Sequence, residues 1–469
     1  MSAPDTNLQE SLDPAILGAA DRLREAFDSG RTRPLAWRRE QLKRLKDLVR
    51  EQSHELVAAL QADFGKPELE AWTMDVALIG SECDAALKQL SRWTRPERVR
   101  TPLAQSPGRS RIVRDPLGVV LIISPWNYPV QLLLSPLVGA IAAGNCAVLK
   151  PSEVTPHTSA ALAKWIPQYL DNDCFQTVEG AVEETTALLG QRFDHIFYTG
   201  NGTVARVVME AAAKNLTPVT LELGGKSPCI IDRNANIEVA ARRIAWGKFV
   251  NAGQTCVAPD YVLVHPECEE ELVQKLGETI RDFYGDDPSQ TPDFARIVNT
   301  RHHHRLASLL KESGDIVVGG ELSEDDCYVA PTVVRNVTAE SPLMSEEIFG
   351  PILPILTSES VEESIAFVNR REKPLALYVF TEDKAVEEKV ISETTSGGVC
   401  VNAIVWHIAN PNLPFGGVGP SGMGAYHGRA SFETFSHRKS VMTKPTRFDM
   451  KFLYPPYSRF KTKFVRKML

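Results

Sequence analysis

Cys256 is the residue of this sequence best suited to act as a nucleophile. It stands in FVNAGQTCVAPDYVLV, where Gly253 and Pro259 enclose a bend between an amphipathic helical segment and an apolar strand. The pattern predicts a thiol on a loop, and a thiolate is a strong nucleophile when its pKa is lowered and its surroundings are partly open. A buried cysteine is instead a small apolar residue. The residues around Cys256, taken alone, leave this structural alternative open.

Glu222 and Asn127 have the chemistry to assist a nucleophile. Glu222 in VTLELGGKSP ends a β-branched apolar run. It either has a partner that offsets its desolvation or is a general base of raised pKa. Asn127 lies between Pro125 and Pro129 in SPWNYP, and the prolines restrict this loop. Its side-chain amide is either a donor to a developing oxyanion or a cap of its own turn.

Two segments have the character of a dinucleotide site. In LKPSE, Lys150 and Glu153 end an apolar strand and begin a helix, a pair that suits ribose hydroxyls or a phosphate but also suits a surface ion pair. The segment HIFYTGNGTVARVV predicts a strand, a glycine turn and a helix start, whose free N–H groups can face a pyrophosphate. It contains Gly200 and Gly202 but has Ala205 where a third small residue belongs, so it departs from the G-x-G-x-x-G fingerprint.

Alternating helix and strand patterns position these residues. Parallel strands need long crossovers, which helices supply, so the alternation predicts two parallel α/β units. A solvent-facing helical layer from Ile16 to about Ala62 precedes them. The predicted helices are 132–143, 159–169, 181–188, 237–249 and 269–284, and the predicted strands are 146–149, 175–178, 195–198, 229–232 and 261–265.

Length and composition exclude several classes of protein. A chain of 469 residues is too long for one hydrophobic core, so two or three packed units are expected. The net charge of −7 gives no reason to expect a nucleic-acid partner. The 8 cysteines contain no C-x-x-C pair, which argues against a zinc knuckle or a disulfide scaffold. The first residues lack a secretory signal, so we expect a cytoplasmic protein.

Two stretches resemble other kinds of site. The apolar run 132–149 is nearly long enough to span a bilayer. However, Pro136 suits the first turn of a helix and Gly144 its end, so we expect helix, turn and strand. The consecutive histidines 302–304 point about 100° apart on a helix and cannot converge on one metal ion. They predict a solvated helical face, and no metal site is expected.

The last ten residues alternate basic and aromatic or aliphatic side chains. This end is expected either to pack as an amphipathic segment, which we favour, or to make weak contact with an anionic membrane. Its basic residues are Lys461, Lys463, Arg466 and Lys467, and its apolar residues are Phe460, Phe464 and Val465.

With these segments in place, the chain resembles the aldehyde dehydrogenase superfamily, most closely its shorter class 3 branch. Seven motifs occur in the family's order and at similar spacing from about Ile16 onward, namely PWNYP, KPSE, TGN, LELGGKSP, GQTC, EEIFGP and PFGGVGPSGMG. The resemblance implies that Cys256 is the nucleophile, Glu222 the general base and Asn127 the oxyanion donor.

The resemblance also implies a site for NAD or NADP. Lys150 and Glu153 would contact the adenosine ribose, and Glu347 and Phe349 would position the nicotinamide ribose and ring. Class 3 members commonly carry glycine at position 205, so alanine there implies a slightly different pose without loss of binding. The residues expected beside the pyrophosphate are Gly200, Asn201, Gly202, Thr203, Val204 and Ala205.

The implied fold is an aldehyde dehydrogenase-like α/β fold. A Rossmann-like cofactor domain would comprise residues 1–97 and 117–221, and a catalytic domain residues 222–425. Residues 98–116 and 426–469 would form a small β oligomerisation flap, and a homodimer is expected. In this flap, strands from about Arg98 to Arg114 would pair with the chain beyond Tyr426.

The implied activity is oxidation of an aldehyde to the carboxylic acid with NAD(P)+. An aromatic or a medium- or long-chain aliphatic aldehyde would form a cysteine thiohemiacetal and then a thioester, which water activated by Glu222 hydrolyses. A CoA-acylating enzyme is one alternative, and Glu222 argues against it. An inactive scaffold protein is another, and the seven motifs argue against it. The choice between NAD and NADP stays open, because Glu153 would repel a 2′-phosphate whereas class 3 members often accept both.

Overall fold

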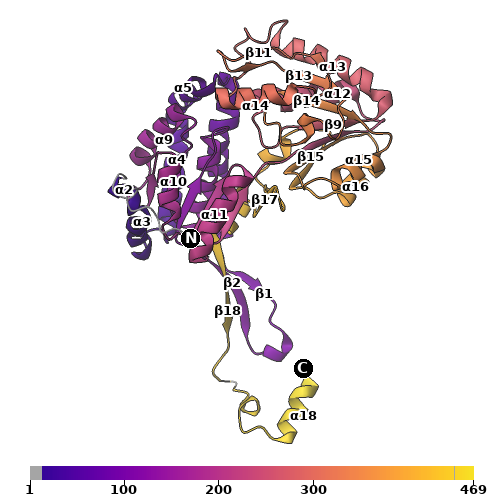
Figure 1. The fold of residues 1–469 in the computed structure, drawn as a ribbon. Coiled ribbons are helices and arrows are strands. Elements are labelled where there is room, and N and C mark those ends of the chain that lie inside the picture. The colour runs from indigo at the N-terminus through magenta and orange to yellow at the C-terminus, as the bar shows by residue number, and fades with distance from the viewer. Residues whose placement is uncertain (1–12, 448, 469) are drawn as a thin grey trace.

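The computed structural model describes residues 13–447 and 449–468, and two mainly parallel sheets form its centre (Figure 1). The first sheet has the strand order β17-β7-β6-β3-β4-β5. Its strands are β3 (Val119–Ile123), β4 (Cys146–Lys150), β5 (Phe175–Thr177), β6 (His195–Thr199), β7 (Val219–Glu222) and the antiparallel β17 (Gly422–Met423). The helices between these strands are α8 (Gln131–Ala143), α9 (Pro156–Tyr169), α10 (Val182–Leu189) and α11 (Gly202–Asn215).

The second sheet has the strand order β10-β13-β14-β9-β8-β15-β16. Figure 1 shows α12 and α13 on one side of it and α15 and α16 on the other. Its strands are β8 (Pro228–Ile231), β9 (Tyr261–Val264), the antiparallel β10 (Asp315–Val318), β13 (Thr332–Arg335), β14 (Ile352–Thr357), β15 (Ala376–Phe380) and β16 (Gly398–Val401). The helices of this region are α12 (Ile237–Phe249), α13 (Pro266–Tyr284), α14 (Thr300–Leu310), α15 (Val361–Asn369) and α16 (Lys384–Glu393), and β11 (Leu322–Ser323) pairs with β12 (Tyr328–Val329).

A helical layer precedes the first sheet, as its spacing of apolar residues predicts. Leu42, Leu45 and Leu48 are fully buried along one side of its amphipathic helix 35–51. The layer consists of α2 (Pro14–Leu17), α3 (Ala19–Asp28), α4 (Leu35–Glu51), α5 (Ser53–Phe64), α6 (Glu68–Glu70), the π-helical turn η1 (Ala71–Val76) and α7 (Ala77–Trp93).

The predicted alternation is confirmed, with one local error in α8. Every residue of this helix is buried, as a core segment requires, and Gly144 ends it in the left-handed conformation. Pro136, however, lies inside α8 and not in its first turn. The helix begins at Gln131, whose N–H is accepted by the Asp75 carboxylate, so a distant side chain starts the helix earlier than the local sequence suggests.

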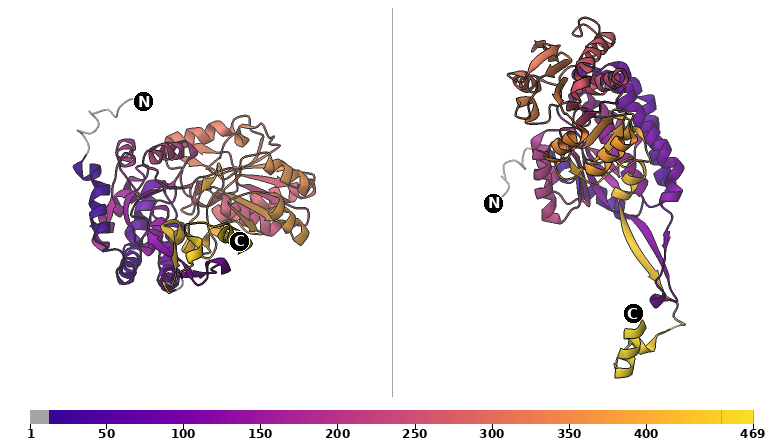
Figure 2. Two further views of the ribbon diagram at one scale, coloured as in Figure 1. Left: turned by 90° about the horizontal axis from the view of Figure 1, so that it is seen from below. Right: turned by 90° about the vertical axis from the view of Figure 1, so that its right-hand side faces the viewer.

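A three-stranded stalk projects from the body (Figures 1 and 2). It consists of β1 (Glu97–Val99), β2 (Arg109–Pro116) and β18 (Ser436–Thr443), and β2 pairs with both of the others. The predicted pairing of the segment near 98–114 with the chain beyond Tyr426 is therefore confirmed. The predicted boundaries differ in two places, since α17 (Gly428–Thr434) packs on α7 and α8 of the body and β17 joins the first sheet.

The C-terminal helix α18 (Arg459–Met468) lies beyond the stalk, away from the body (Figures 1 and 2). Phe460 is 78% exposed, so the expectation that this end packs is wrong within a single chain. The side chain of Lys467 lies outside the described residues. None of the helices within 13–447 and 449–468 combines the length and apolar character needed to cross a bilayer.

The histidine run on α14 is only partly solvated, contrary to expectation. His303 is 4% exposed, and its Nε2 lies 3.1 Å from the backbone oxygen of Tyr328. His302 packs against Trp126 with 5.2 Å between ring centroids. The helix lies between two other parts of the chain, which the local pattern of residues does not reveal. Among the described residues, no group of three or more histidine, cysteine, aspartate or glutamate side chains is arranged to hold a metal.

Asn145 connects three parts of the body and offers a test of the packing. Its Oδ1 accepts from the N–H of Gly118, and its Nδ2 donates to the oxygens of Phe435 and Ala140. We expect Asn145→Ala to lower the free energy of unfolding by about 1–3 kcal/mol, because it leaves buried backbone groups without partners. Urea denaturation measures the change. The exposed Asn412→Ala is the control, and equal midpoints for the two variants would contradict this account of the packing.

Candidate active site

The predicted site residues gather where two sheet edges meet. Asn127, Lys150, Gly200 and Glu222 lie at the carboxyl ends of strands β3, β4, β6 and β7, the edge at which open parallel sheets bind ligands. Cys256 lies on the loop before β9, at the amino edge of the second sheet. Hydrogen bonds join the edges: Asn127 Nδ2 donates to Gln254 O at 3.0 Å, and the hydroxyls of Tyr128 and Thr255 lie 2.8 Å apart.

An unusual backbone carries Cys256 from helix α12 into the junction. Asn251, Ala252 and Gly253 all have positive φ, at 54°, 50° and 71°. A side chain at Gly253 would collide with the backbone, because its Cβ would lie 2.3 Å from Gly350 O. The Gln254 side chain then fixes the loop by bonding to backbone groups of Asn251, Arg296 and Val298. The glycine of GQTC thus meets the glycine of EEIFGP, which positions the thiol beside Glu347.

The Cys256 thiol is partly exposed, and its pKa is raised to about 12. Burial is the main cause, and the nearby carboxyl groups of Glu347 and Glu222 add to it. The lowered pKa that would make this thiol a strong nucleophile is therefore not found in the chain by itself. The neighbouring carboxyl groups come from distant segments, and their proximity is not visible in the sequence around the cysteine.

Glu222 is buried without a partner. It is 2% exposed, and neither carboxyl oxygen has a hydrogen-bond partner within the described residues. Burial raises the pKa of this carboxyl well above its ordinary value. The sequence left two alternatives for Glu222, a partner that offsets its desolvation or a general base of raised pKa. No such partner is found among the described residues.

Glu347 brings a second carboxyl group to the same junction. Burial and the nearby Asp260 carboxylate raise its pKa to about 8, while the Gly225 N–H acts in the opposite direction. Gly224 provides the space for it, because a Cβ there would lie 2.1 Å from Glu347 Oε2. Gly224 thus leaves space for the Glu347 carboxyl group, and the backbone N–H of Gly225 donates to it.

Asn127 is held so that its amide has a fixed direction. The residue is 2% exposed, and its carbonyl accepts from Asn251 Nδ2 at 3.0 Å. Its side-chain NH2 group gives one hydrogen to Gln254 O. The NH2 group carries a second hydrogen, which is the one available to an oxyanion.

The predicted cofactor residues fit a dinucleotide. Lys150 is 1% exposed with its Nζ 3.7 Å from Glu153 Oε2, so the two side chains lie together at the end of β4. At the start of α11, Asn201 caps the helix through the Val204 N–H, and Ala205 is buried. The small methyl group of Ala205 is thus accommodated at the helix–sheet contact. Gly202 is partly exposed, and Thr203 and Val204 face outward.

Phe349 lies close to the Cys256 loop and completes this set. It has φ 46°, and its ring meets Trp126 edge-on with 5.4 Å between centroids. Together with the partly exposed Glu347, it offers a carboxyl group and an aromatic face near the thiol. The Lys150–Glu153 pair, the amino end of α11 and this pair are groups of the kinds that can bind a dinucleotide.

Several residues of the junction were not predicted from the sequence. Lys66 and Asp75 form a fully buried ion pair beside Asn127, with 2.6 Å between nitrogen and oxygen. Glu70 accepts from the Asn251 N–H, and burial raises its pKa to about 7. His302 contacts the ring of Trp126, the residue that precedes Asn127 in the sequence. In the sequence, Lys66, Glu70 and Asp75 stand in an amphipathic helical layer. Charged residues in such a layer are typical of an ordinary exposed helix, so they gave no sign of a buried cluster.

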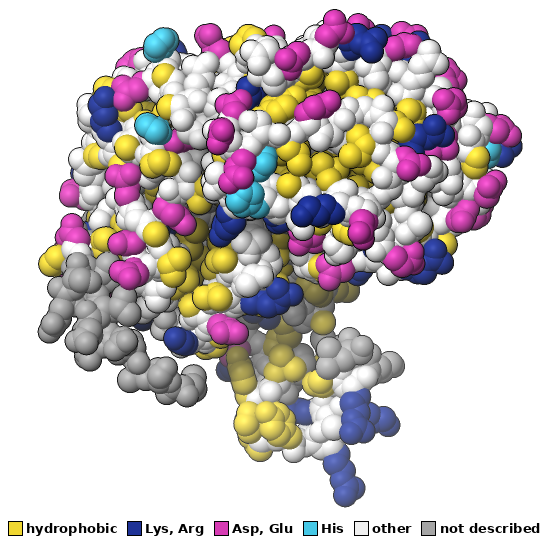
Figure 3. Space-filling view, turned by 45° about the horizontal axis from the view of Figure 1, so that its top comes forward, with side chains coloured by type: hydrophobic (Ala, Val, Ile, Leu, Met, Phe, Trp, Pro, Cys, Tyr) yellow, Lys and Arg dark blue, Asp and Glu magenta, His cyan; other side chains and the backbone are white. Residues whose placement is uncertain are grey.

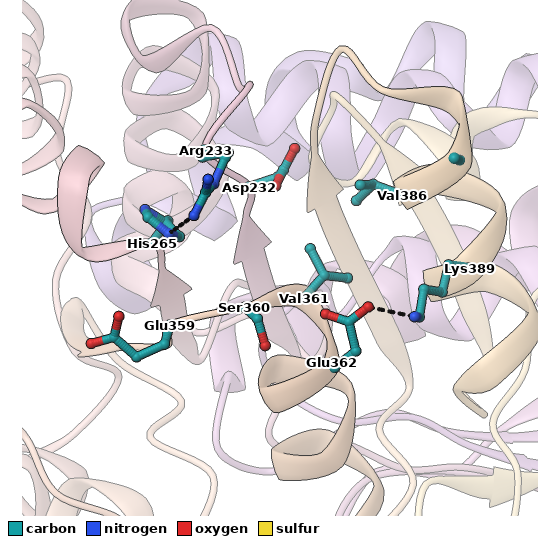
Figure 4. Close-up of a pocket in the computed structure, with 10 residues that line it drawn as sticks. Asp232, Arg233, His265, Glu359, Ser360, Val361, Glu362, Val386 and Lys389 are labelled. Carbon is teal, nitrogen blue, oxygen red and sulfur yellow. Dashed lines mark hydrogen bonds and ion pairs between the residues drawn. The ribbon is translucent and has the colours of Figure 1, made fainter.

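A cavity of about 350 Å³ lies at the opposite, carboxyl edge of the second sheet (Figure 4). Two pairs of polar side chains line it, because Arg233 lies 2.7 Å from His265 and Lys389 lies 2.5 Å from Glu362. Asp232 accepts from the Thr381 hydroxyl. Figure 4 shows the Arg233–His265 and Lys389–Glu362 pairs, and this cavity is separate from the buried carboxyl group of Glu222 beside Cys256.

This arrangement, with a thiol beside a dinucleotide-type sheet edge and two carboxyl groups, suits a dinucleotide-dependent dehydrogenase. The model of the aldehyde dehydrogenase family matches residues 8–441, and the chain belongs to that family. The resemblance inferred from the seven motifs is therefore confirmed, as is the fold class. The chain is an NAD(P)-dependent aldehyde dehydrogenase of the class 3 branch.

The relatives found are similar along almost their whole length. Aldehyde dehydrogenase family 3 member A2 of Mus musculus is 51% identical over 450 residues, covering 96% of this chain and 93% of the relative. The dimeric NADP-preferring aldehyde dehydrogenase of Rattus norvegicus is 50% identical over 430 residues, covering 92% and 95%. A solved structure, the substrate-bound state of Staphylococcus aureus AldH, has a TM-score of 0.93 at 46% identity and covers 96% and 98%.

The raised pKa of Cys256 predicts how the cofactor-free enzyme reacts with iodoacetamide. We expect the alkylation rate at Cys256 to rise roughly tenfold per pH unit from about pH 7 to about pH 10, because only the thiolate reacts. Peptide mass spectrometry follows each cysteine separately.

Glu347→Gln is the informative variant, because it removes a carboxyl group that ionises near pH 8 and raises the thiol pKa. It should speed alkylation above that pH. A wild-type rate that already levels off below about pH 9 would contradict the raised thiol pKa.

Proposed function

We propose that this enzyme oxidises its aldehyde through a thioester on Cys256, which water hydrolyses with Glu222 as the general base. The observation that carries the proposal is the position of Glu222, which is buried beside the thiol with neither carboxyl oxygen partnered among the described groups. A carboxyl group of raised pKa is suited to take a proton from water near neutral pH.

In the first half of the reaction, the Cys256 thiolate attacks the aldehyde carbonyl carbon. The negative charge that develops on oxygen is met by the second Asn127 Nδ2 hydrogen and the Cys256 backbone N–H. A bound nicotinamide would supply the acceptor for the hydride lost from the aldehyde carbon, and its positive charge would favour the thiolate. Loss of the Asn127 donor should raise the barrier by about 3 kcal/mol.

In the second half, the carboxylate of Glu222 removes a proton from water as the water attacks the thioester carbon. The same oxyanion donors meet the second tetrahedral adduct, which expels the Cys256 thiolate and leaves the carboxylic acid. The raised pKa makes this base stronger than an exposed glutamate. Lys150, Glu153, the turn 200–205, Glu347 and Phe349 would hold the dinucleotide.

An enzyme that passes the acyl group to CoA is the nearest alternative, and it needs no base at Glu222. Purified enzyme incubated with NAD+ and an aldehyde, in the absence of CoA, distinguishes the two. We expect stoichiometric free acid. Product formation only after CoA is added would refute hydrolysis. A panel of aromatic and of medium- and long-chain aliphatic aldehydes, which we propose as the substrate class, belongs in the same assay.

We further propose a cytoplasmic homodimer, since one of the relatives is named as dimeric and the stalk presents β1 and β18 away from the body. Weak contact of α18 with an anionic membrane surface is also proposed. Its sequence RFKTKFVRKM has no acidic residue, and Figure 3 shows basic side chains gathered at the end of the stalk.

Glu222→Gln separates the two halves of the reaction. We expect one equivalent of reduced cofactor to form per active site at nearly the wild-type rate, followed by a steady state slower by about 10²–10⁴-fold, because a general base is lost. In the wild type, the deacylation rate should fall as pH falls through the raised pKa of Glu222, since only the carboxylate accepts the proton. Stopped-flow absorbance measures both phases.

The exposed Glu359→Gln is the matched control for this charge change and should behave as the wild type. A Glu222→Gln enzyme with full steady-state turnover would eliminate the proposed base.

Glu153 sets an expectation for cofactor choice. Its carboxylate lies 3.7 Å from Lys150 Nζ, where it would repel the 2′-phosphate of NADP. We expect Glu153→Gln to raise the kcat/KM ratio of NADP over NAD by about fivefold, the effect of one unit charge at contact distance in water. Steady-state kinetics with both cofactors measure the ratio, and Glu183→Gln on the surface of α10 is the control. An unchanged ratio would place the ribose elsewhere.

A further inference from the structure

Lys66 lies buried beside the loop that carries Asn127, although it belongs to the N-terminal helical layer. It is 0% exposed, and its Nζ lies 2.6 Å from Asp75 Oδ2 and 3.3 Å from Asn127 O. The same ammonium group sits 3.8 Å from the centroid of the Tyr128 ring. A carboxylate, a carbonyl and an aromatic face thus engage the three N–H donors of one lysine.

Asp75 fastens the other end of the same loop. Its Oδ1 accepts from the N–H of Gln131, the first residue of α8, at 3.0 Å. Asp75 itself lies in the π-helical turn η1, a rare form that often occurs near functional sites. The ion pair therefore holds the loop at two points, with Lys66 on Asn127 in its middle and Asp75 on Gln131 at its end.

The carbonyl held by Lys66 belongs to the same residue that would supply the oxyanion donor. Asn251 Nδ2 also donates to this carbonyl, at 3.0 Å, and to Gln254 O at 3.1 Å. Gln254 O in turn accepts from Asn127 Nδ2. The direction of the remaining Asn127 amide hydrogen is consequently set by contacts to both its backbone and its side chain.

We propose that Lys66, neutralised by Asp75, is a positioning residue that aims the Asn127 amide at the developing oxyanion. The inference rests on the proposed role of Asn127. An oxyanion donor works only when it is held close to its productive position, and displacements near 1 Å cost about a hundredfold in rate. A neutral side chain of similar length fills the space but donates no hydrogen bond to the Asn127 carbonyl.

The test is a double-mutant cycle in the full-length enzyme with NAD+ and benzaldehyde or octanal. Lys66→Met, Asn127→Ala and the double variant are compared by the single-turnover rate of cofactor reduction at saturating aldehyde. We expect Lys66→Met to slow this rate about tenfold to a hundredfold, with cofactor affinity unchanged. In the Asn127→Ala background it should change the rate less than about twofold, because the donor through which it acts is gone.

Arg38→Met is the matched control. Arg38 is another buried cation, 6% exposed, that donates to a backbone oxygen of α8, at Ala142 near the opposite end of the helix. The Arg38→Met variant should lower the thermal midpoint of unfolding without changing the single-turnover rate. A purely structural role of Lys66 would produce the same behaviour as this control and would overturn the inference.

Lys66→Met leaves the Asp75 charge buried alone, and this variant is at risk of misfolding. Lys66→Met combined with Asp75→Asn removes both charges and keeps an acceptor for the Gln131 N–H. We expect this pair to remain slow. If the variant that combines Lys66→Met with Asp75→Asn has the wild-type rate while Asn127→Ala is slow, the role of Lys66 is overturned and the role of Asn127 stands. A full rate in Asn127→Ala would overturn the proposed oxyanion donor and this inference with it.

Discussion

Desolvation of ionisable groups where the two sheet edges meet is the constraint on which the site depends. The carboxyl edge of the first sheet closes against the amino edge of the second, and water is excluded from Glu222 and limited at Cys256. Burial there raises the pKa values of both groups and of Glu347. The same exclusion of water obliges the surrounding backbone to find internal partners, which accounts for the fixed loops around Asn127 and Gln254.

The two sheets differ in strand order and contribute to the site from different edges. In each, the first strand lies between later ones, so that a crevice opens at the carboxyl edge. The first sheet uses that edge for the dinucleotide residues and Glu222. The second sheet supplies Cys256 and Glu347 from its amino edge, and its carboxyl-edge cavity is occupied by mutually paired charges around Arg233 and Lys389.

Periodicity was sufficient to predict most elements but not the contacts between distant ones. The helix 132–143 and the strand 146–149 follow from local patterns, whereas β17 joins the first sheet through pairing with β7 that no local signal indicates. The local sequence leaves the roles of Cys256, Glu222 and Asn127 open, and only the family resemblance assigns them. The sign of the thiol pKa and the Lys66–Asp75 pair depend on residues brought together by folding, so the sequence could not reveal them.

The central claim is that the acyl group becomes bonded to one sulfur atom before water releases it. The direct measurement is acid quench of the working enzyme within its first turnover, followed by mass spectrometry of the peptide that contains Cys256. The account predicts that this peptide gains the mass of the acyl group in proportion to the reduced cofactor formed. Full formation of reduced cofactor with an unmodified Cys256 peptide would contradict it.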